Sequence, residues 1–133
     1  MDKSTPAISI QSFEGDEKLQ LIRNYSQGGF QINDDAVIGS VFLHARKSDL
    51  WAPKFVEDIT IDSVLAGLGD ERPALLLLGL GGAPTTRLWD LHQELRAVNI
   101  GMEVMSTPAA CRTWNVLLSE GRDVAAGLLA VES

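Results

Sequence analysis

The single cysteine of the chain is the first candidate for a chemically reactive residue. Cys111 follows Thr107 and Pro108, which predict a helix cap and then proline at the first helical position, and it precedes Arg112. A helix N-terminus and a neighbouring cation both lower the pKa of a thiol, which favours thiolate chemistry. A lone cysteine beside two alanines, with no histidine within a few residues, also fits a small buried side chain. The second interpretation is favoured, and the first stays open.

A glycine-rich segment, Gly79-Leu80-Gly81-Gly82-Ala83-Pro84, is the second candidate. It follows an apolar run and precedes a helical pattern, which is the setting of a dinucleotide-binding loop. That fingerprint requires Gly or Ala at its sixth position, which Pro84 occupies, and proline has no N–H to offer a phosphate. A tight turn is therefore favoured, and no cofactor is predicted.

The remaining titratable residues form no catalytic or metal-binding pattern. His44 and His92 are isolated, with no cysteine or carboxylate at metal-ligand spacing, and are expected at the edge of the core. The acidic pairs Asp34-Asp35 and Asp70-Glu71 fall in predicted turns, where carboxylates are usually solvated. No nucleophile elbow, Walker loop, His-Glu-x-x-His or Cys-x-x-Cys occurs. The sequence thus predicts no catalytic residue and no metal site.

The first half of the chain is predicted to form mainly β-strands. Strand patterns fall at residues 7–13, 19–25, 30–32 and 36–45. The segment 36–45 has apolar residues on both faces, as in a strand covered on both sides. Segment 49–55 is irregular, and a short helix is expected to begin at Ile59 or Thr60 and to end at Gly69.

The second half alternates strands with amphipathic helices. The expected order is strand 74–78, helix 85–98, strand 102–105, helix 107–120 and strand 124–131. This β-α-β-α-β order predicts an α/β unit on a mainly parallel sheet.

Parallel pairing of strands 74–78 and 102–105 would bring the loops that follow them to one sheet edge. Open α/β sheets bind ligands at the carboxyl ends of their strands, and helix N-termini favour anions. The ligand-binding candidates, for a small anion or metabolite, are Gly79, Gly81, Thr107, Cys111, Arg112 and Asn115. Alternatively, Thr107 caps its own helix and Asn115 bonds to nearby backbone.

Trp89 is the candidate interface residue. On the predicted 85–98 helix it falls with Gln93 and Arg96, away from the apolar stripe. An exposed Trp beside an Arg is a typical anchor of protein interfaces, so Trp89 and Arg96 are predicted to contact a partner. The alternative is that the irregular segment 46–55 covers Trp89.

Composition narrows the classes of partner. The chain has 133 residues, with 11 Lys and Arg against 18 Asp and Glu, and its formal net charge of −7 disfavours nucleic acid and anionic membrane surfaces. The longest apolar run, 74–80, is far shorter than the roughly 20 residues that span a bilayer. The first residues match neither a signal peptide nor a presequence, and one cysteine allows no intrachain disulfide, so a cytoplasmic protein is expected.

Two long stretches carry a resemblance to a known family. Residues 76–81 match its LLLGxG segment, and residues 101–122 match a string whose core is TxAAxxTxN followed by EGR, with Trp114 at a position where many relatives have Tyr. Shorter matches lie at residues 29–32, 40–41, 51 and 58–60, and residues 1–25 match least. The chain resembles the small α/β family that includes the mitochondrial respiratory complex I assembly factor 3 and an adipogenesis-associated protein.

The resemblance and the element pattern together imply a fold and a class of function. The expected fold is one compact three-layer α/β domain over residues 1–133, with a central mixed sheet, an N-terminal antiparallel β portion and the C-terminal β-α-β-α-β unit. Eukaryotic members act as assembly or regulatory partners of other proteins, and no established catalytic set carries over. The resemblance implies a non-enzymatic interaction domain of accessory or assembly type with a protein partner. The alternative is a small-anion or metabolite-binding domain with weak catalysis.

Overall fold

A three-stranded antiparallel sheet opens the computed structural model, which describes residues 18–82 and 87–132. Its strands are β1 (Ile22–Ser26), β2 (Gly29–Ile32) and β3 (Asp35–Ile38), paired in chain order. Gln27 and Gly28 both have positive φ, as the tight turn of a two-residue hairpin requires. This sheet is the antiparallel β portion that the sequence predicted.

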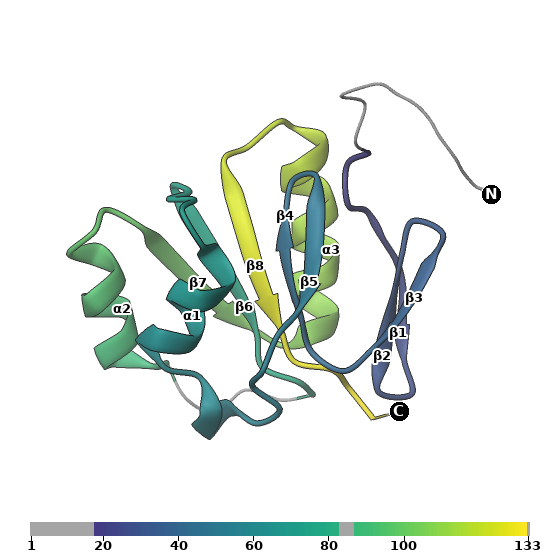
Figure 1. Cartoon of the computed structure of the whole chain (residues 1–133), viewed down its shortest axis with the longest axis horizontal. Helices are drawn as coiled ribbons and strands as arrows, with labels where there is room; N and C mark the ends of the chain where they lie inside the picture. The colour runs from purple at the N-terminus through teal and green to yellow at the C-terminus, as the bar shows by residue number, and fades with distance from the viewer. Residues whose placement is uncertain (1–17, 83–86, 133) are drawn as a thin grey trace.

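A five-stranded mixed sheet forms the centre of the molecule, in the order β5-β4-β8-β6-β7 (Figure 1). Its strands are β4 (Val41–His44), β5 (Lys47–Leu50), β6 (Leu75–Gly79), β7 (Gly101–Met105) and β8 (Val124–Leu128). Strand β6 runs parallel to β7 and β8, and β4 runs antiparallel to β5 and β8. The helices are η2 (Val56–Asp58), α1 (Ile61–Leu68), α2 (Trp89–Arg96) and α3 (Thr107–Ser119).

Alternation along the central strands creates two cores on opposite faces of this sheet. Leu76 and Leu78 of β6 pack into a core with residues of α1 and α2, whereas Leu77 packs into a second core with residues of α3 and the three-stranded sheet. Figure 1 shows α1 and α2 on one side of β6 and β8, and α3 with the β1–β3 sheet on the other. The three-layer α/β prediction is therefore confirmed.

The prediction of one strand over 36–45 is wrong. Gly39 has φ +99°, and the chain turns there, so that residues before it form β3 and residues after Ser40 form β4 in the other sheet. Of these two strands, β4 is buried along its whole length, whereas Ile38 of β3 is 77% exposed. A hairpin then leads into β5, whose last two residues fall in the segment expected to be irregular.

Other boundaries moved for local reasons. The expected strand 7–13 lies outside the described residues. The described α2 spans Trp89–Arg96, shorter than the predicted 85–98, and Leu88 before it is left-handed at φ 52°. Strand β8 ends at Leu128 rather than at 131, since the Val131 carbonyl accepts a hydrogen bond from Gly28 in the β1–β2 turn.

Helix caps were partly predicted. Thr60 caps α1 as expected, and its hydroxyl accepts a hydrogen bond from the Ser63 N–H at 3.1 Å. At α3 the cap is Ser106, whose hydroxyl accepts from the Ala109 N–H, and Thr107 is the first helical residue. The prediction of Thr107 as a cap is therefore wrong, which leaves its hydroxyl available for another contact.

Candidate functional site

The loops after β6 and β7 lie at one edge of the sheet, because the two strands are parallel neighbours. Thr107 closes that edge. Its N–H donates to the Gly81 carbonyl at 2.8 Å, and the Gly81 N–H donates to the Thr107 hydroxyl at 2.9 Å. The same hydroxyl donates to the Leu129 carbonyl at 2.6 Å, and the Thr107 side chain is fully buried. Thr107 thus joins the β6 loop, the end of β8 and the start of α3.

Gly79 allows this close approach. A Cβ atom at Gly79 would lie 3.0 Å from both Cα and Oγ1 of Thr107, and 3.0 Å from a Leu128 methyl group. The Gly79 carbonyl also accepts from the Leu129 N–H at 2.9 Å. Gly79 is therefore packed between backbone segments, and of the two predicted glycines it is Gly81 that faces an open space.

Cys111 lies in the core on the α3 side of the sheet and is 3% exposed. Burial raises the pKa of the Cys111 thiol to about 12, and the neighbouring Arg112 guanidinium opposes this shift only weakly. Arg112 itself is exposed. A buried thiol with a raised pKa is not a ready nucleophile.

Asn115 holds a distant strand. Its side-chain carbonyl accepts from the Ile22 N–H at 2.9 Å, and its amide donates to the Ile22 carbonyl at 2.8 Å. The indole N–H of the preceding residue, Trp114, donates to the Gln20 carbonyl at 2.7 Å. Asn115 therefore links α3 to β1, on the face of the sheet opposite to Gly81. The six predicted ligand-binding residues do not surround a common cavity.

Two hollows lie at this sheet edge, on the face of the central sheet that α1 and α2 cover. One hollow of about 660 Å³ lies between segment 54–59, the loop residues Leu80 and Gly81 after β6, and the residues after β8. A second, of about 620 Å³, lies between residues 59–61 and the start of α2. The two share Ile59 and Leu88 and are called the acidic groove below.

Two aromatic side chains stand open along the acidic groove. Phe55 lines the first hollow and is 66% exposed, and Trp89 lines the second and is 64% exposed. Helix α2 buries Leu91 and Leu95, which turns Trp89 outward, and segment 46–55 does not cover it. Phe55 was missed by the sequence analysis because it lies in a segment with no apolar periodicity to mark its direction.

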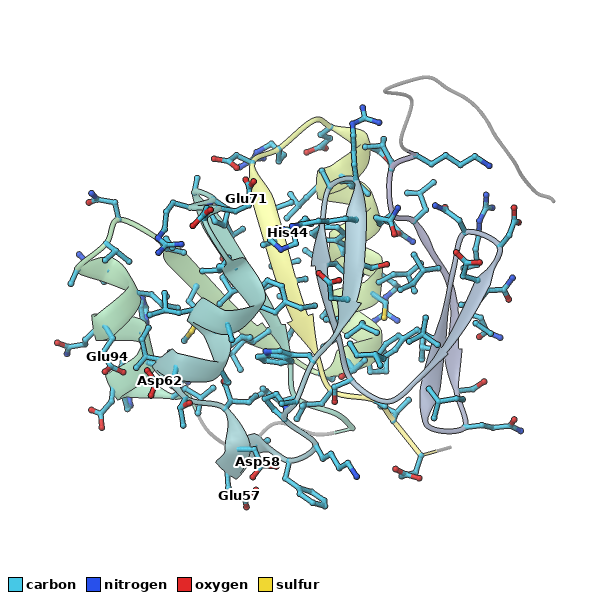
Figure 2. The ribbon with its side chains drawn as sticks, in the orientation of Figure 1. His44, Glu57, Asp58, Asp62, Glu71 and Glu94 are labelled. Atoms are coloured by element: carbon cyan, nitrogen blue, oxygen red, sulfur yellow. The ribbon has the colours of Figure 1, made fainter. Side chains whose placement is uncertain are left out.

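The rim of the acidic groove carries more negative than positive side chains. Glu57 and Glu132 line the first hollow, Asp90 and Glu94 line the second, and Lys54 is the one cation among these lining residues. Figure 2 shows Glu57 and Asp58 at η2, with Asp62 of α1 and Glu94 of α2 at the same end of the molecule. Asp58 serves the fold, because its carboxylate accepts from the Lys54 and Phe55 N–H groups.

Arg96, the second predicted interface residue, lies just beyond the groove. With Trp89, His92 and Gln93 it lines a separate hollow of about 360 Å³. Trp89 therefore borders both this hollow and the acidic groove. His44 lies elsewhere, buried beside Phe42, with its Nε2 2.9 Å from the Gly67 carbonyl.

Neither metal ligation nor membrane insertion is indicated by the part of the chain that the structure describes. Within residues 18–82 and 87–132, no three His, Cys, Asp or Glu side chains come together as a metal site would need. Over the same residues, no helix has the length and apolar character needed to cross a bilayer.

The chain is similar in sequence to proteins of several organisms and in fold to solved structures. An uncharacterized protein of Rhodobacter capsulatus is 38% identical over 108 residues, which cover 81% of this chain and 82% of that protein. The human NADH dehydrogenase [ubiquinone] 1 alpha subcomplex assembly factor 3 is 34% identical over 109 residues; these cover 81% of this chain but 59% of the human protein. A crystal structure of a Bordetella parapertussis protein superposes with a TM-score of 0.78 at 28% identity, covering 85% of this chain and 97% of that one.

The family assignment follows from a match over most of the described residues. The model of the family described as "Protein of unknown function (DUF498/DUF598)" matches residues 22–129, from the first residue of β1 to the residue after β8. This range includes the Thr107 junction, the Asn115 link and most of the acidic groove. The chain belongs to the DUF498/DUF598 family.

Proposed function

We propose that this chain is a non-enzymatic protein-interaction domain with an accessory role in the assembly of other proteins. The observation that carries the proposal is the pair of exposed aromatic side chains, Phe55 and Trp89, on a groove of two adjoining hollows. Large aromatic side chains left in water are typical of surfaces that a partner covers, and they supply much of the affinity of interfaces. The polar residues predicted for chemistry, Thr107 and Asn115, are engaged in holding the fold.

The name of the human relative supplies a specific target for this role. That protein is an assembly factor of NADH dehydrogenase, and the match to it covers 81% of this chain. We extend the same role to this chain as part of the proposal: it assists assembly of a respiratory NADH dehydrogenase. A reducing compartment such as the cytoplasm suits its single cysteine, which is a free thiol.

The alternative function, binding of a small anion or metabolite at the sheet edge, stays a prediction. The Thr107 junction fills the position between the two loops, and the carboxylates of the adjoining groove would repel an anion. These observations favour the interaction role. A thermal-shift screen with phosphates, nucleotides and carboxylates tests the alternative, since a ligand of the native state raises the melting temperature.

A deletion strain of the source organism tests the proposed function. We expect loss of the chain to lower the amount of assembled NADH dehydrogenase on native gels, and wild-type protein to restore it. The double variant Phe55→Ser/Trp89→Ser should fail to restore it, while Val116→Ser should succeed, because Val116 is an apolar residue of similar exposure on α3. Normal assembly in the deletion strain would remove the proposed target.

A further inference from the structure

We propose that the acidic groove binds a basic peptide segment of a partner protein, one in which Lys or Arg residues alternate with large apolar residues. This inference rests on the proposed interaction role and specifies the chemistry of the partner.

The charges on the rim favour a cationic partner. The groove is lined by four carboxylates, Glu57, Asp90, Glu94 and Glu132, and by one cation, Lys54. None of the four carboxylates forms an ion pair within residues 18–82 and 87–132. The described part of the chain therefore leaves these charges without a paired cation, and they attract a cationic segment while they repel an acidic one.

The apolar floor of the groove favours a partner that also carries apolar side chains. Ile59 and Leu80 are buried below the groove, Leu88 is half-buried between its two hollows, and the rings of Phe55 and Trp89 are exposed at its sides. A purely cationic ligand would leave these surfaces in water. A peptide with apolar side chains would bury them, and the two adjoining hollows offer separate places for successive large side chains. The aromatic faces also attract cations, so Lys or Arg beside them is favoured.

Two other occupants fit the same groove less well. Residues 1–17 of the chain contain one lysine and four carboxylates, and a second copy of the protein would bring another surface of a molecule with net charge −7. Both would place like charges against the rim, at an energetic cost. The partner of opposite charge is therefore the one to which we commit.

The tryptophans provide a direct reading of groove occupancy. Trp51 and Trp114 are 7% and 0% exposed, whereas Trp89 is 64% exposed, so quenching by acrylamide reports mainly on Trp89. The probes are two synthetic peptides of about a dozen residues, free of tryptophan, one of alternating Leu and Lys and one of alternating Leu and Glu. We expect the Leu-Lys peptide to protect Trp89 from acrylamide and to bind more weakly as salt is raised, and the Leu-Glu peptide to do neither.

Matched charge variants separate a local effect from one of net charge. Glu57→Lys/Glu94→Lys reverses one carboxylate in each hollow and should weaken binding of the Leu-Lys peptide about tenfold. Asp34→Lys/Asp35→Lys makes the same change in net charge at the exposed β2–β3 turn and should leave the affinity within about twofold. Equal weakening by both variants would overturn the proposal, as would equal binding of both peptides.

Self-association is measured in parallel by sedimentation. A dimer whose formation protects Trp89 would show that a second copy fills the groove and would also overturn the proposal. A failed peptide experiment leaves the deletion phenotype intact, so the partner chemistry and the assembly role are tested separately.

Discussion

Thr107 and Leu129 are joined by a 2.6 Å hydrogen bond in which the buried threonine hydroxyl donates to the carbonyl one residue beyond β8. The same oxygen accepts from the Gly81 N–H, so one side chain ties together segments that are 22 and 26 residues away in sequence. This junction occupies the position where an open α/β sheet would present a ligand-binding cleft. The hollowed surface at this sheet edge is instead the acidic groove beside the junction.

Thr107→Val tests the junction. The substitution keeps the shape of the side chain but leaves the Leu129 carbonyl and the Gly81 N–H without their partner, which should lower the free energy of unfolding by about 1–3 kcal/mol. Urea denaturation monitored by circular dichroism measures it. Thr107→Ser retains the hydroxyl and should cost less. A valine variant as stable as the wild type would show that the hydrogen bonds of the hydroxyl do not stabilise the junction.

Cys111 should react slowly in the folded protein. With a pKa of about 12, only about 1 thiol in 10,000 is ionised at pH 8, and the thiol is also buried. We expect iodoacetamide to label native protein at pH 8 at least about a hundredfold more slowly than protein in guanidinium. A Cys111→Ala/Ser119→Cys variant, with an exposed thiol at the end of α3, is the control for reagent access.

The raised pKa of Cys111 also predicts the sign of a pH effect on stability. The folded state holds the proton more tightly than the unfolded chain, whose thiol titrates near 9.0. This contribution to stability is fully present below pH 9 and is lost as the pH rises from about 9 toward about 12. The loss of stability at high pH should be smaller in Cys111→Ala. Urea denaturation at neutral and at high pH measures it for both proteins, and an equal fall of the urea midpoint in the two would contradict the prediction.

Asn115→Ala should release β1 from α3. The variant loses both hydrogen bonds to the Ile22 backbone, and we expect a destabilisation of about 1–3 kcal/mol together with faster hydrogen exchange of the Ile22 amide. Arg112→Ala, on the same helix but exposed, should change stability by no more than about 0.5 kcal/mol. Unchanged exchange at Ile22 in Asn115→Ala would show that the link does not hold the strand.

Gly127→Ala tests the packing of the central strand β8. A Cβ atom at Gly127 would lie 2.7 Å from the Trp51 ring, so the ring must move, and overpacking of this kind should cost about 1–3 kcal/mol. Trp51 is fixed by its indole N–H, which donates to the Ser63 carbonyl at 2.9 Å. Gly82→Ala, where a Cβ atom meets nothing within 4 Å, is the matched control and should be close to neutral in thermal unfolding.

Local patterns in the sequence were sufficient for much of the fold. The apolar run at 74–78 and the helical spacing up to Leu95 predicted β6 and α2, because burial on both faces of a strand or on one stripe of a helix selects these periods. The prediction of one strand over 36–45 is wrong because the chain turns between the two sheets at Gly39, and a single glycine within an apolar segment does not reveal its φ.

The sequence by itself determined the classes of secondary structure, the α/β unit of the second half and the acidic balance of the chain, since these depend on residue type and short-range spacing. The three-layer arrangement was implied by the resemblance to a family. Only the tertiary structure decided which side chains are used for the fold and which remain free for a partner. The sequence offers Thr107, Cys111 and Asn115 as ligand-binding candidates. In the structure Thr107 and Asn115 form hydrogen bonds with residues up to 93 positions away, and Cys111 is buried in the core. Phe55, Trp89 and the surrounding carboxylates form a surface only because η2, the end of β8 and α2 meet at one sheet edge, and such long-range proximity leaves no local pattern.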